Sequence, residues 1–336
     1  MRVLVTGGAG FIGANLCREL AARSEIAQVV ALDDLSTGTA ANLDGTDAHL
    51  IEGSILDRRL LARAVGQADA VVHLAARPSV PRSLADPVAT HEANVTGTLY
   101  VLEECRRRSI HVVAASSSSV YGSTAHLPKH EDLPTRPLSP YAASKLAGEA
   151  YLLAYCSSFA VPALALRFFN VYGPLQSAGH AYAAVVPAFV SAALRGEPLP
   201  MHGDGTQTRD FTYVGTVTRV LADAVVQRTT CATPVNLAFG TRVSLLDLHQ
   251  RLSVAVGRRL DIEFRPTRSG DVHDSQAAND RLRELFPDIS PVPLDAGLRA
   301  TVAWFSGLEP SVSVPALRHP DRAEGTPLSA TPKPIA

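Results

Sequence analysis

The first half of the chain alternates short apolar runs with segments whose apolar residues recur at helical spacing. The runs are rich in β-branched residues: RVLVT (2–6), QVVALD (28–33), HLIEG (49–53), AVVHLAA (70–76) and HVVAASS (111–117). Helix-like segments at 11–22 and 88–107 lie between several of them. Strands that are apolar on both faces and alternate with helices indicate a parallel sheet covered on both sides. We therefore predict an α/β fold with a doubly wound, Rossmann-type parallel sheet.

From about residue 170 this regular order loosens, and shorter patterns are separated by Pro- and Gly-rich turns such as GEPLPMHGDGTQ (196–207). We predict that residues 1–170 form the main sheet domain, to which 161–168 and later segments return as further elements. Residues 171–305 are predicted to form mainly a smaller α/β domain that closes over one end of the first. Residues 306–336 are rich in Pro, Ser, Thr and Ala, which predicts a disordered tail.

The net charge and the cysteine spacing exclude several classes of ligand and cross-link. The formal net charge of −1 offers no basic footprint for nucleic acid or an anionic membrane, so an anionic ligand must be held by local groups. The four cysteines, at 17, 105, 156 and 231, show no C-x-x-C spacing, so we predict neither a metal site nor a disulfide framework. Glycines interrupt the apolar start, and serines and Pro162 interrupt the apolar stretch at 150–169. These breaks argue against a signal peptide and a membrane span, and we expect a cytoplasmic protein.

Glycines follow the first predicted strand directly. VTGGAGFIG places Gly7, Gly10 and Gly13 in the spacing G-x-x-G-x-x-G, before the first predicted helix. A pyrophosphate needs backbone N–H groups at close range, which a Cβ would obstruct, and the helix N-terminus adds a favourable dipole. A glycine triplet alone is weak evidence, because glycine-rich turns also serve packing. Its position between strand and helix makes it a candidate dinucleotide site.

Two carboxylates follow later strands. Asp33 ends the second strand and is placed to accept hydrogen bonds from adenosine ribose hydroxyls, which favours NAD because a carboxylate would repel the 2′-phosphate of NADP. Asp57, after the third strand, is a candidate for contacting the adenine edge. The alternative for Asp57 is an N-cap on the helix that follows, and both roles can hold at once.

The stretch SPYAASKLAGEAY (139–151) pairs a tyrosine with a lysine. Ser139 and Pro140 are typical of a helix start, so Tyr141 and Lys145 lie one turn apart on one helix face. A tyrosine pKa is near 10, and a nearby ammonium or a positively charged nicotinamide ring lowers it. A surface Tyr/Lys pair is the common alternative. The serines at 117, 118 and 119 argue against this alternative, because they follow the fifth strand at the sheet edge where ligands of such folds bind.

Taken together, these motifs resemble the extended short-chain dehydrogenase/reductase family, and within it the nucleotide-sugar 4-epimerases. The resemblance covers residues 1 to about 305. It is carried by the glycine loop, HLAA (73–76), the serine block before Val120–Gly122, Tyr141-x-x-x-Lys145, SVPRSLADP (79–87), RFFNVYGP (167–174), AYAAVVP (181–187), GDGTQTRDFTYV (203–214) and RSGDVHDS (268–275). A bound NAD and a UDP-sugar substrate are what this resemblance implies.

The resemblance also implies roles for individual residues. Ser117 would be the catalytic serine, Tyr141 the base, and Lys145 its partner and a ribose ligand. The cofactor would be bound by Gly7, Gly10, Phe11, Ile12, Gly13, Asp33, Asp34, Ser36, Ile55, Asp57, Ala75, Asn94, Tyr141 and Lys145, with Asn94 ordering a loop. The substrate would be bound by Ser79, Arg82, Ser117, Ser118, Ser119, Tyr141, Asn170, His180, Arg209, Arg268 and Asp271. Asn170, Arg209 and Arg268 would hold the diphosphate, and Asp271 the nucleoside ribose. A turn cap at Asn170 and a surface pair Arg209–Asp210 are the alternatives.

The expected reaction is inversion at C4 of the sugar through a 4-keto intermediate. A 4,6-dehydratase of this family carries an Asp–Glu pair where this chain has Ser118 and Ser119. A UDP-glucuronate decarboxylase usually has a Glu near that block. A regulator that only binds NAD would not need the three catalytic residues, and a net oxidoreductase stays open. Glucose, N-acetylglucosamine and glucuronate forms of the substrate all stay open, with Ser79, Arg82 and His180 as candidates to contact C2 or C6 substituents. Relatives of this kind pair helices near 88–107 and 140–157, which implies a homodimer.

Overall fold

The structure is a computed structural model and describes residues 1–178, 183–267 and 272–308. Its strands are β1 (Arg2–Thr6), β2 (Gln28–Asp33), β3 (His49–Glu52), β4 (Ala70–His73), β5 (His111–Ser117), β6 (Ala163–Phe168), β7 (Val171–Tyr172), β8 (Leu199–His202), β9 (Thr208–Arg209), β10 (Thr212–Tyr213), β11 (Val235–Leu237), β12 (Val243–Ser244) and β13 (Ile262–Arg265). Its α-helices are α1 (Phe11–Ala21), α2 (Arg58–Val65), α3 (Val80–Ala85), α4 (Pro87–His91), α5 (Gly97–Arg106), α6 (Pro140–Phe159), α7 (Val185–Arg195), α8 (Val214–Val226), α9 (Leu245–Val256), α10 (Asp280–Leu285) and α11 (Leu294–Leu308). Between them lie the 3₁₀ helices η1 (Ala40–Leu43) and η3 (Ser118–Tyr121) and the π-helix η2 (Glu92–Thr96).

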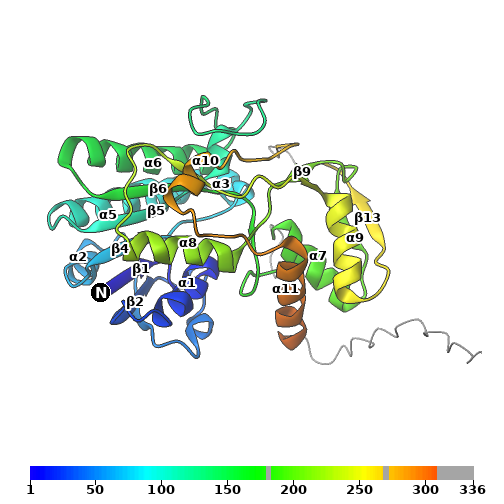
Figure 1. Ribbon diagram of the computed structural model, residues 1–336, viewed down its shortest axis with the longest axis horizontal. Helices are drawn as coiled ribbons and strands as arrows, with labels where there is room; N and C mark the ends of the chain where they lie inside the picture. Colours follow the sequence, from blue (N-terminus) through cyan, green and yellow to red (C-terminus); the bar gives the residue numbers. More distant parts are fainter. Residues whose placement is uncertain (179–182, 268–271, 309–336) are drawn as a thin grey trace, which may run out of the picture.

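The described residues contain a seven-stranded sheet in the order β11-β6-β5-β4-β1-β2-β3, in which every pair is parallel. The strand order reverses direction between β1 and β4, which is the crevice where doubly wound folds bind their ligands. The prediction of a doubly wound parallel sheet is confirmed (Figure 1). The helix predicted over 88–107 is instead divided into α4, η2 and α5, because a π-helical turn interrupts the α-helical hydrogen bonds.

Helices cover both faces of the sheet because successive strand residues point to opposite sides. In β1, Val3 and Val5 pack into one apolar cluster with residues of α1 and α8. Leu4, between them, packs into a second cluster with residues of α2, α5 and α6. All three side chains are buried. The two clusters are the cores on the two faces of the sheet.

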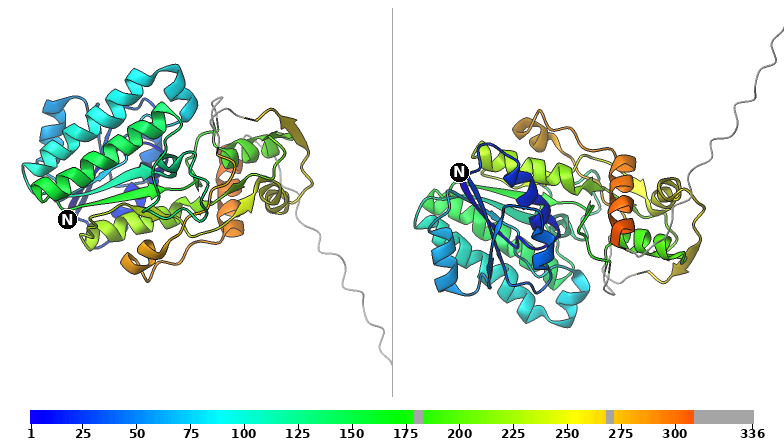
Figure 2. Two further views of the ribbon diagram at one scale, coloured as in Figure 1. Left: turned by 90° about the horizontal axis from the view of Figure 1, so that it is seen from above. Right: turned by 90° about the horizontal axis from the view of Figure 1, so that it is seen from below.

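A smaller assembly lies beside the carboxyl ends of the main strands (Figure 2). In it, α7, α9 and α11 pack around an apolar cluster that includes Phe189, Leu248 and Leu298. Strand β8 pairs with β13, and the short strands β9 and β12 pair with each other. The chain passes between the two parts more than once. Helix α8 packs on the main sheet and β11 joins it, although α7 and β8 of the smaller part precede them in the sequence.

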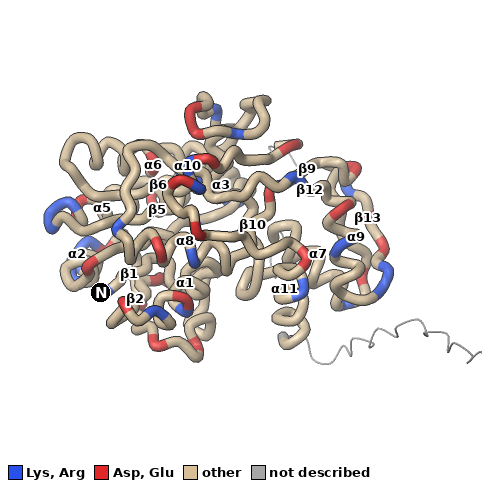
Figure 3. The backbone as a smooth tube through the Cα atoms, in the orientation of Figure 1, with Lys and Arg blue, Asp and Glu red and all other residues tan. Residues whose placement is uncertain are grey.

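Basic and acidic residues are interspersed along the backbone, and no face in this view is dominated by one sign (Figure 3). Within the described ranges, no helix is both long enough and apolar enough to cross a membrane.

Candidate active site

A cleft of about 760 Å³ lies at the carboxyl ends of β1, β2, β4 and β5. Many of the predicted residues line it together: Gly7, Gly10, Phe11, Ile12, Gly13, Asp33, Asp34, Ser36, Ile55, Ala75, Arg82, Ser117, Tyr141, Lys145 and Asn170. These residues come from segments far apart in the sequence. They meet because the carboxyl ends of parallel strands share one edge of a sheet.

The glycine loop at the floor of this cleft leaves no room for side chains at two positions. Gly7 has a φ of +71°, and a Cβ there would lie 2.7 Å from the backbone nitrogen of Ala75. A Cβ at Gly13 would lie 2.0 Å from the carbonyl oxygen of Gly7, which packs α1 tightly against the loop. Gly10 precedes the first residue of α1 and lines the cleft, so the helix N-terminus faces it. This cradle is suited to an anionic pyrophosphate.

Asp33 lies at the end of β2 and is nearly buried. Its Oδ2 accepts a hydrogen bond from the backbone N–H of Ala9 at 2.9 Å, and its Oδ1 accepts one from Leu35 at 2.8 Å. Burial raises the pKa of this carboxyl group, while those two backbone hydrogen bonds lower it. A carboxylate has about four lone-pair sites, so acceptor capacity is left for ribose hydroxyls. The loop, the cleft and this acceptor together fit NAD.

The catalytic candidates converge from two elements. Ser117 ends β5, and Tyr141 and Lys145 lie in the first two turns of α6. That helix starts where the sequence predicts, since the Ser139 hydroxyl accepts a hydrogen bond from the backbone N–H of Ala142 at 3.1 Å and Pro140 follows. All three candidates line the cleft, beside the glycine loop.

Burial shifts the pKa values of three groups at this site. It raises the pKa of Tyr141, and a hydrogen bond with Ser117 opposes that rise. It lowers the pKa of Lys145 to about 8, against the influence of the Glu149 carboxylate. Behind them, burial and the Lys145 charge lower the pKa of His73 to about 3, so this imidazole is neutral. His73 Nδ1 lies 2.8 Å from the Thr6 hydroxyl and its Nε2 lies 2.9 Å from that of Thr98.

Of the three serines, only Ser117 lines the cleft. The Ser119 hydroxyl donates to the Ser117 hydroxyl oxygen at 2.9 Å and so holds that side chain from behind. Ser118 begins η3 outside the residues that line the cleft. Ser79 likewise lies outside the lining and caps α3, where its hydroxyl accepts the N–H of Arg82, which does line the cleft. Ser79 holds a φ of +92°, a strained conformation for a residue with a side chain.

Two further cofactor candidates, Asp57 and Asn94, are not among the described residues that line the cleft, although their neighbours Leu56 and Ala93 are. Asp57 caps α2, and its Oδ1 accepts the backbone N–H groups of Arg59 and Leu60 at 2.9 and 3.0 Å. Asn94 is buried on the π-helix η2 and joins two segments. Its Oδ1 accepts the N–H of Arg77 at 2.7 Å, while its Nδ2 donates to the Ser144 hydroxyl at 2.9 Å. It therefore ties the loop after β4 to the first turns of α6.

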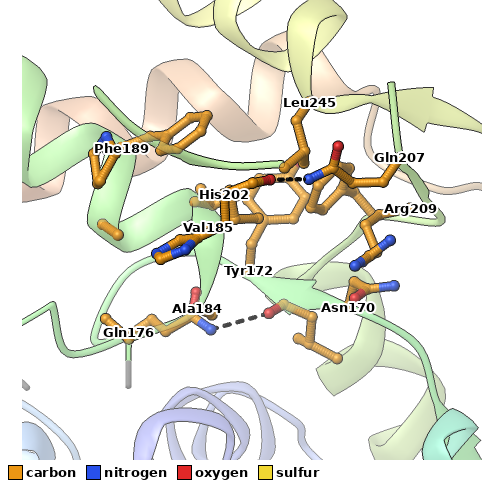
Figure 4. A pocket seen from close by; sticks show the side chains of 16 residues that line it. Asn170, Tyr172, Gln176, Ala184, Val185, Phe189, His202, Gln207, Arg209 and Leu245 are labelled. Atoms are coloured by element: carbon orange, nitrogen blue, oxygen red, sulfur yellow. Dashed lines mark hydrogen bonds between the residues drawn. The ribbon is translucent and has the colours of Figure 1, made fainter. Parts of the chain in front are cut away.

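A second pocket of about 220 Å³ is lined mainly by residues of the smaller part of the molecule, from α7, β8 and β9 among others (Figure 4). It shares Asn170 and Val171 with the cleft, so the two cavities meet there. Its lining includes Arg209, Gln207 and His202. Of these three residues, only Arg209 is among those for which the resemblance implies a role. Arg209 and Asn170 lie close together at one end of the pocket (Figure 4). In the sequence, only their place in the turn-rich stretch at 196–207 marked Gln207 and His202 as candidates for a pocket.

Arg209 and Asp210 do not form the surface pair considered as an alternative. Arg209 Nη1 donates to the carbonyl oxygens of Thr208 and His273, each at 2.9 Å. Asp210 is fully buried, and its carboxylate accepts hydrogen bonds from Gly240, Thr241 and Ala277. The aspartate anchors two loops and the arginine lines the pocket. His180, Arg268 and Asp271 lie outside the described residues.

Comparison with known proteins gives the same picture. The model of the NAD dependent epimerase/dehydratase family matches residues 3–237. A UDP-glucose 4-epimerase of Mycolicibacterium smegmatis is 38% identical over 315 residues, which is 91% of this chain and 98% of the relative. A solved UDP-N-acetylglucosamine 4-epimerase from Methanobrevibacter ruminantium, in complex with UDP-N-acetylmuramic acid, superposes with a TM-score of 0.86 at 33% identity, covering 92% of this chain and 99% of that one.

A UDP-glucuronic acid 4-epimerase from Bacillus cereus, solved with UDP-glucuronic acid and NAD, superposes with a TM-score of 0.83 at 32% identity and covers 92% of this chain and all of that one (100%). The family match spans the glycine loop, the serine block and the Tyr-Lys helix. The chain therefore belongs to the NAD dependent epimerase/dehydratase family, within the extended short-chain dehydrogenases/reductases that its motifs resemble.

Proposed function

We propose that the protein is an NAD-dependent isomerase that inverts the configuration at C4 of a UDP-sugar through a transient 4-keto sugar. The observation that carries the proposal is the convergence of Ser117, Tyr141 and Lys145 on a cleft built for a dinucleotide. That cleft meets a second pocket at Asn170 and Val171, which offers a place for the nucleotide of the substrate. The relatives named above are 4-epimerases of such sugars.

The glycine loop and Asp33 would hold NAD, which would supply the acceptor and then the donor of the C4 hydride. The Tyr141 oxygen takes the proton of the C4 hydroxyl as the carbonyl forms, and gives it back when the alcohol is restored. Ser117 donates a hydrogen bond to the developing carbonyl oxygen. Lys145, one turn along α6, stabilises the tyrosine anion with its charge. Protons and electrons balance within one turnover, so no external reductant is needed.

Inversion requires the sugar to present both faces while the nucleotide stays bound. We assign the diphosphate to Asn170 and Arg209, and also to Arg268 as the resemblance implies, because a protein of net charge −1 needs fixed local cations for this ligand. The Arg209 guanidinium is already oriented by two carbonyl oxygens, so little side-chain entropy is lost on binding. The sugar would then lie near the shared residues of the two cavities, in the cleft that Arg82 also lines.

The active site lacks residues that two other reactions of this family use, 4,6-dehydration and decarboxylation. The positions that carry an Asp–Glu pair in the 4,6-dehydratases are Ser118 and Ser119, which have no carboxyl group to act on C5 and C6. The serine block also lacks the glutamate usual in the decarboxylases. A regulator that only binds NAD would have no use for Tyr141 at the cleft.

Incubation of the purified protein with UDP-glucose, UDP-N-acetylglucosamine and UDP-glucuronate, without added NAD, tests this function. We expect at least one C4 epimer pair to interconvert to equilibrium, with no net change in the cofactor. Release of carbon dioxide, a 4-keto-6-deoxy product or strict dependence on added NAD would each contradict the proposal. The preferred sugar among the three identifies the substrate.

We propose further that the protein is a homodimer joined through α5 and α6. The outward side of α6 carries no charge, because its two charged residues, Lys145 and Glu149, point into the molecule. Tyr151 and Phe159 on this helix are 41% and 51% exposed. Exposed apolar side chains grouped on a helix face mark an interaction surface.

Light scattering tests the dimer. We expect the parent chain to have twice its mass of 35.5 kDa, and the variant Tyr151→Asp to dissociate because a buried, unpaired carboxylate is costly. Val254→Asp is the matched control, since Val254 is 76% exposed on α9 and its variant should keep the parent mass. A monomeric parent would refute the proposal.

We also place the protein in the cytoplasm. All four cysteines lie in the described part of the chain as free thiols, and Cys17 and Cys105 are buried with pKa values raised by burial to about 12. Inert, reduced cysteines are typical of a reducing compartment.

A further inference from the structure

A buried ion pair that the mechanism above does not use lies beneath the catalytic residues. Glu149 of α6 and Arg167 of β6 have side chains that are only 3% and 4% exposed. Glu149 Oε1 accepts from Arg167 Nη2 at 2.7 Å, and its Oε2 accepts from Arg167 Nε at 2.9 Å and from the Ser116 hydroxyl at 2.6 Å. Three hydrogen bonds therefore fix the orientation of this carboxylate.

Glu149 and Lys145 are four residues apart on α6 and so share a helix face. Both line a small cavity of about 10 Å³, which is close to the smallest volume that holds one water molecule. The other polar side chains around it belong to His73, Asn94, Thr98 and Ser116. Glu149 is the only carboxylate among the described residues that line this cavity.

The charges around Lys145 come from several elements. Neutral His73 faces it from β4, and Tyr141 precedes it on its own helix. On the open side, the cleft is lined by charged residues of both signs: Asp33, Asp34, Arg77, Arg82 and Glu92. Arg167 stands behind Glu149 and does not line the small cavity. On the buried side, Glu149 is therefore the carboxylate that shares a cavity with Lys145.

We propose that Glu149 is a positioning residue whose fixed negative charge keeps Lys145 protonated, and so lets Lys145 stabilise the ionised Tyr141. The link to catalysis rests on the proposed function, but the charge relation between Glu149 and Lys145 does not. Burial lowers the pKa of Lys145 to about 8, and Glu149 opposes that change. A further fall in this pKa would leave much of the lysine uncharged near neutral pH. Without Glu149, the balance would shift toward the neutral amine.

Lysine NMR measures this directly, because the chain has only three lysines, Lys129, Lys145 and Lys333. We would label the lysine side chains with ¹³C and titrate the NAD-loaded full-length protein, assigning Lys145 by its loss in a Lys145→Arg variant. In Glu149→Gln we expect the Lys145 pKa to fall by roughly one to two units, as for unit charges about one helical turn apart at an effective dielectric constant near 20. The Lys129 signal is an internal control.

Two controls separate charge from structure. Ser116→Ala removes a hydrogen bond to the carboxylate but keeps its charge, so the Lys145 pKa should stay near the parent value. The single Glu149→Gln variant also leaves Arg167 buried without its partner, which by itself lowers stability. Glu149→Leu combined with Arg167→Met removes both charges, and the Lys145 pKa should fall there as well, because only Glu149 lines the cavity.

The pH profile of kcat provides the catalytic readout. Lys145 is charged below its pKa, so a lower pKa moves the alkaline limb of activity to lower pH by the same roughly one to two units, while the acidic limb moves less. A Lys145 pKa that stays within a few tenths of a unit in both charge-removing variants would overturn the proposal. If the lysine shifts as expected but the parent shows no C4 inversion, the proposed function fails and the charge relation stands.

Discussion

Replacing Tyr141 with phenylalanine is expected to lower kcat for C4 inversion by roughly a hundredfold to ten-thousandfold, the usual contribution of a positioned general acid–base group. The phenylalanine ring fills the same space, and Tyr141 is the only hydroxyl-bearing residue of α6 among the described residues that line the cleft. Ser117 also lines the cleft, but a serine hydroxyl is a far weaker acid than a phenol and does not replace the base. Initial rates with a saturating UDP-sugar give the comparison.

The matched control is Tyr151→Phe, the same change on the same helix. Tyr151 lies outside the cleft, and phenylalanine keeps its ring for the proposed dimer contact, so this variant should keep the parental rate. Both variants should retain bound NAD and unfold at nearly the parental temperature, because Tyr141→Phe loses only one hydrogen bond, worth about 1 kcal/mol. A Tyr141→Phe protein that inverts C4 at the parental rate would exclude Tyr141 as the acid–base group.

Replacing Gly13 with alanine is expected to weaken NAD binding by roughly thirtyfold or more and to lower the free energy of unfolding by about 1–3 kcal/mol. The added Cβ would lie 2.0 Å from the Gly7 carbonyl oxygen, which is backbone and cannot rotate away. Either α1 or the glycine loop must shift, and both form the cradle for the pyrophosphate. NAD retained through purification and the thermal unfolding midpoint are the measurements.

Gly307→Ala is the control for this change, since Gly307 is also helical but an added Cβ there meets no atom within 4 Å. Its stability should be unchanged or slightly raised, because alanine is the better helix former by up to about 1 kcal/mol. If Gly13→Ala bound NAD as tightly as the parent, the loop would not be the pyrophosphate site. Loss of NAD in Gly13→Ala with an intact fold would locate the effect in the cradle.

The local parts of this protein could be predicted from the sequence. The strands β1, β2 and β5 have the predicted bounds, and α1 differs from its prediction by one residue. The apolar runs determine them because each strand is buried on both faces, and Ser139–Pro140 determines where α6 begins because it caps the helix. The same local rules put glycines before α1 and a hydroxyl block after β5, so the cleft and about half of the residues that line it were predicted.

Other features depend on contacts between distant segments. The π-helical turn at η2 interrupts a segment that reads as one helix, and it places Asn94 between Arg77 and Ser144. The residues that bond to the Asn94 side chain are 17 and 50 positions away in the sequence, so the pattern of the segment itself does not predict them. The buried Asp210 is a similar case, since an Arg-Asp dipeptide gives no sign that the aspartate will anchor loops near 240 and 277.

By itself, then, the sequence determined the sheet class, the dinucleotide loop and the Tyr-Lys helix, because each follows from the order and spacing of neighbouring residues. Only the tertiary structure decided that α8 and β11 return to the main sheet, that the nucleotide pocket meets the cleft at Asn170, and that Glu149 and Arg167 pair beneath Lys145. Those relations join elements far apart in the chain. They exist because burying both faces of one sheet forces the segments together, and a buried charge must then find a partner of opposite sign.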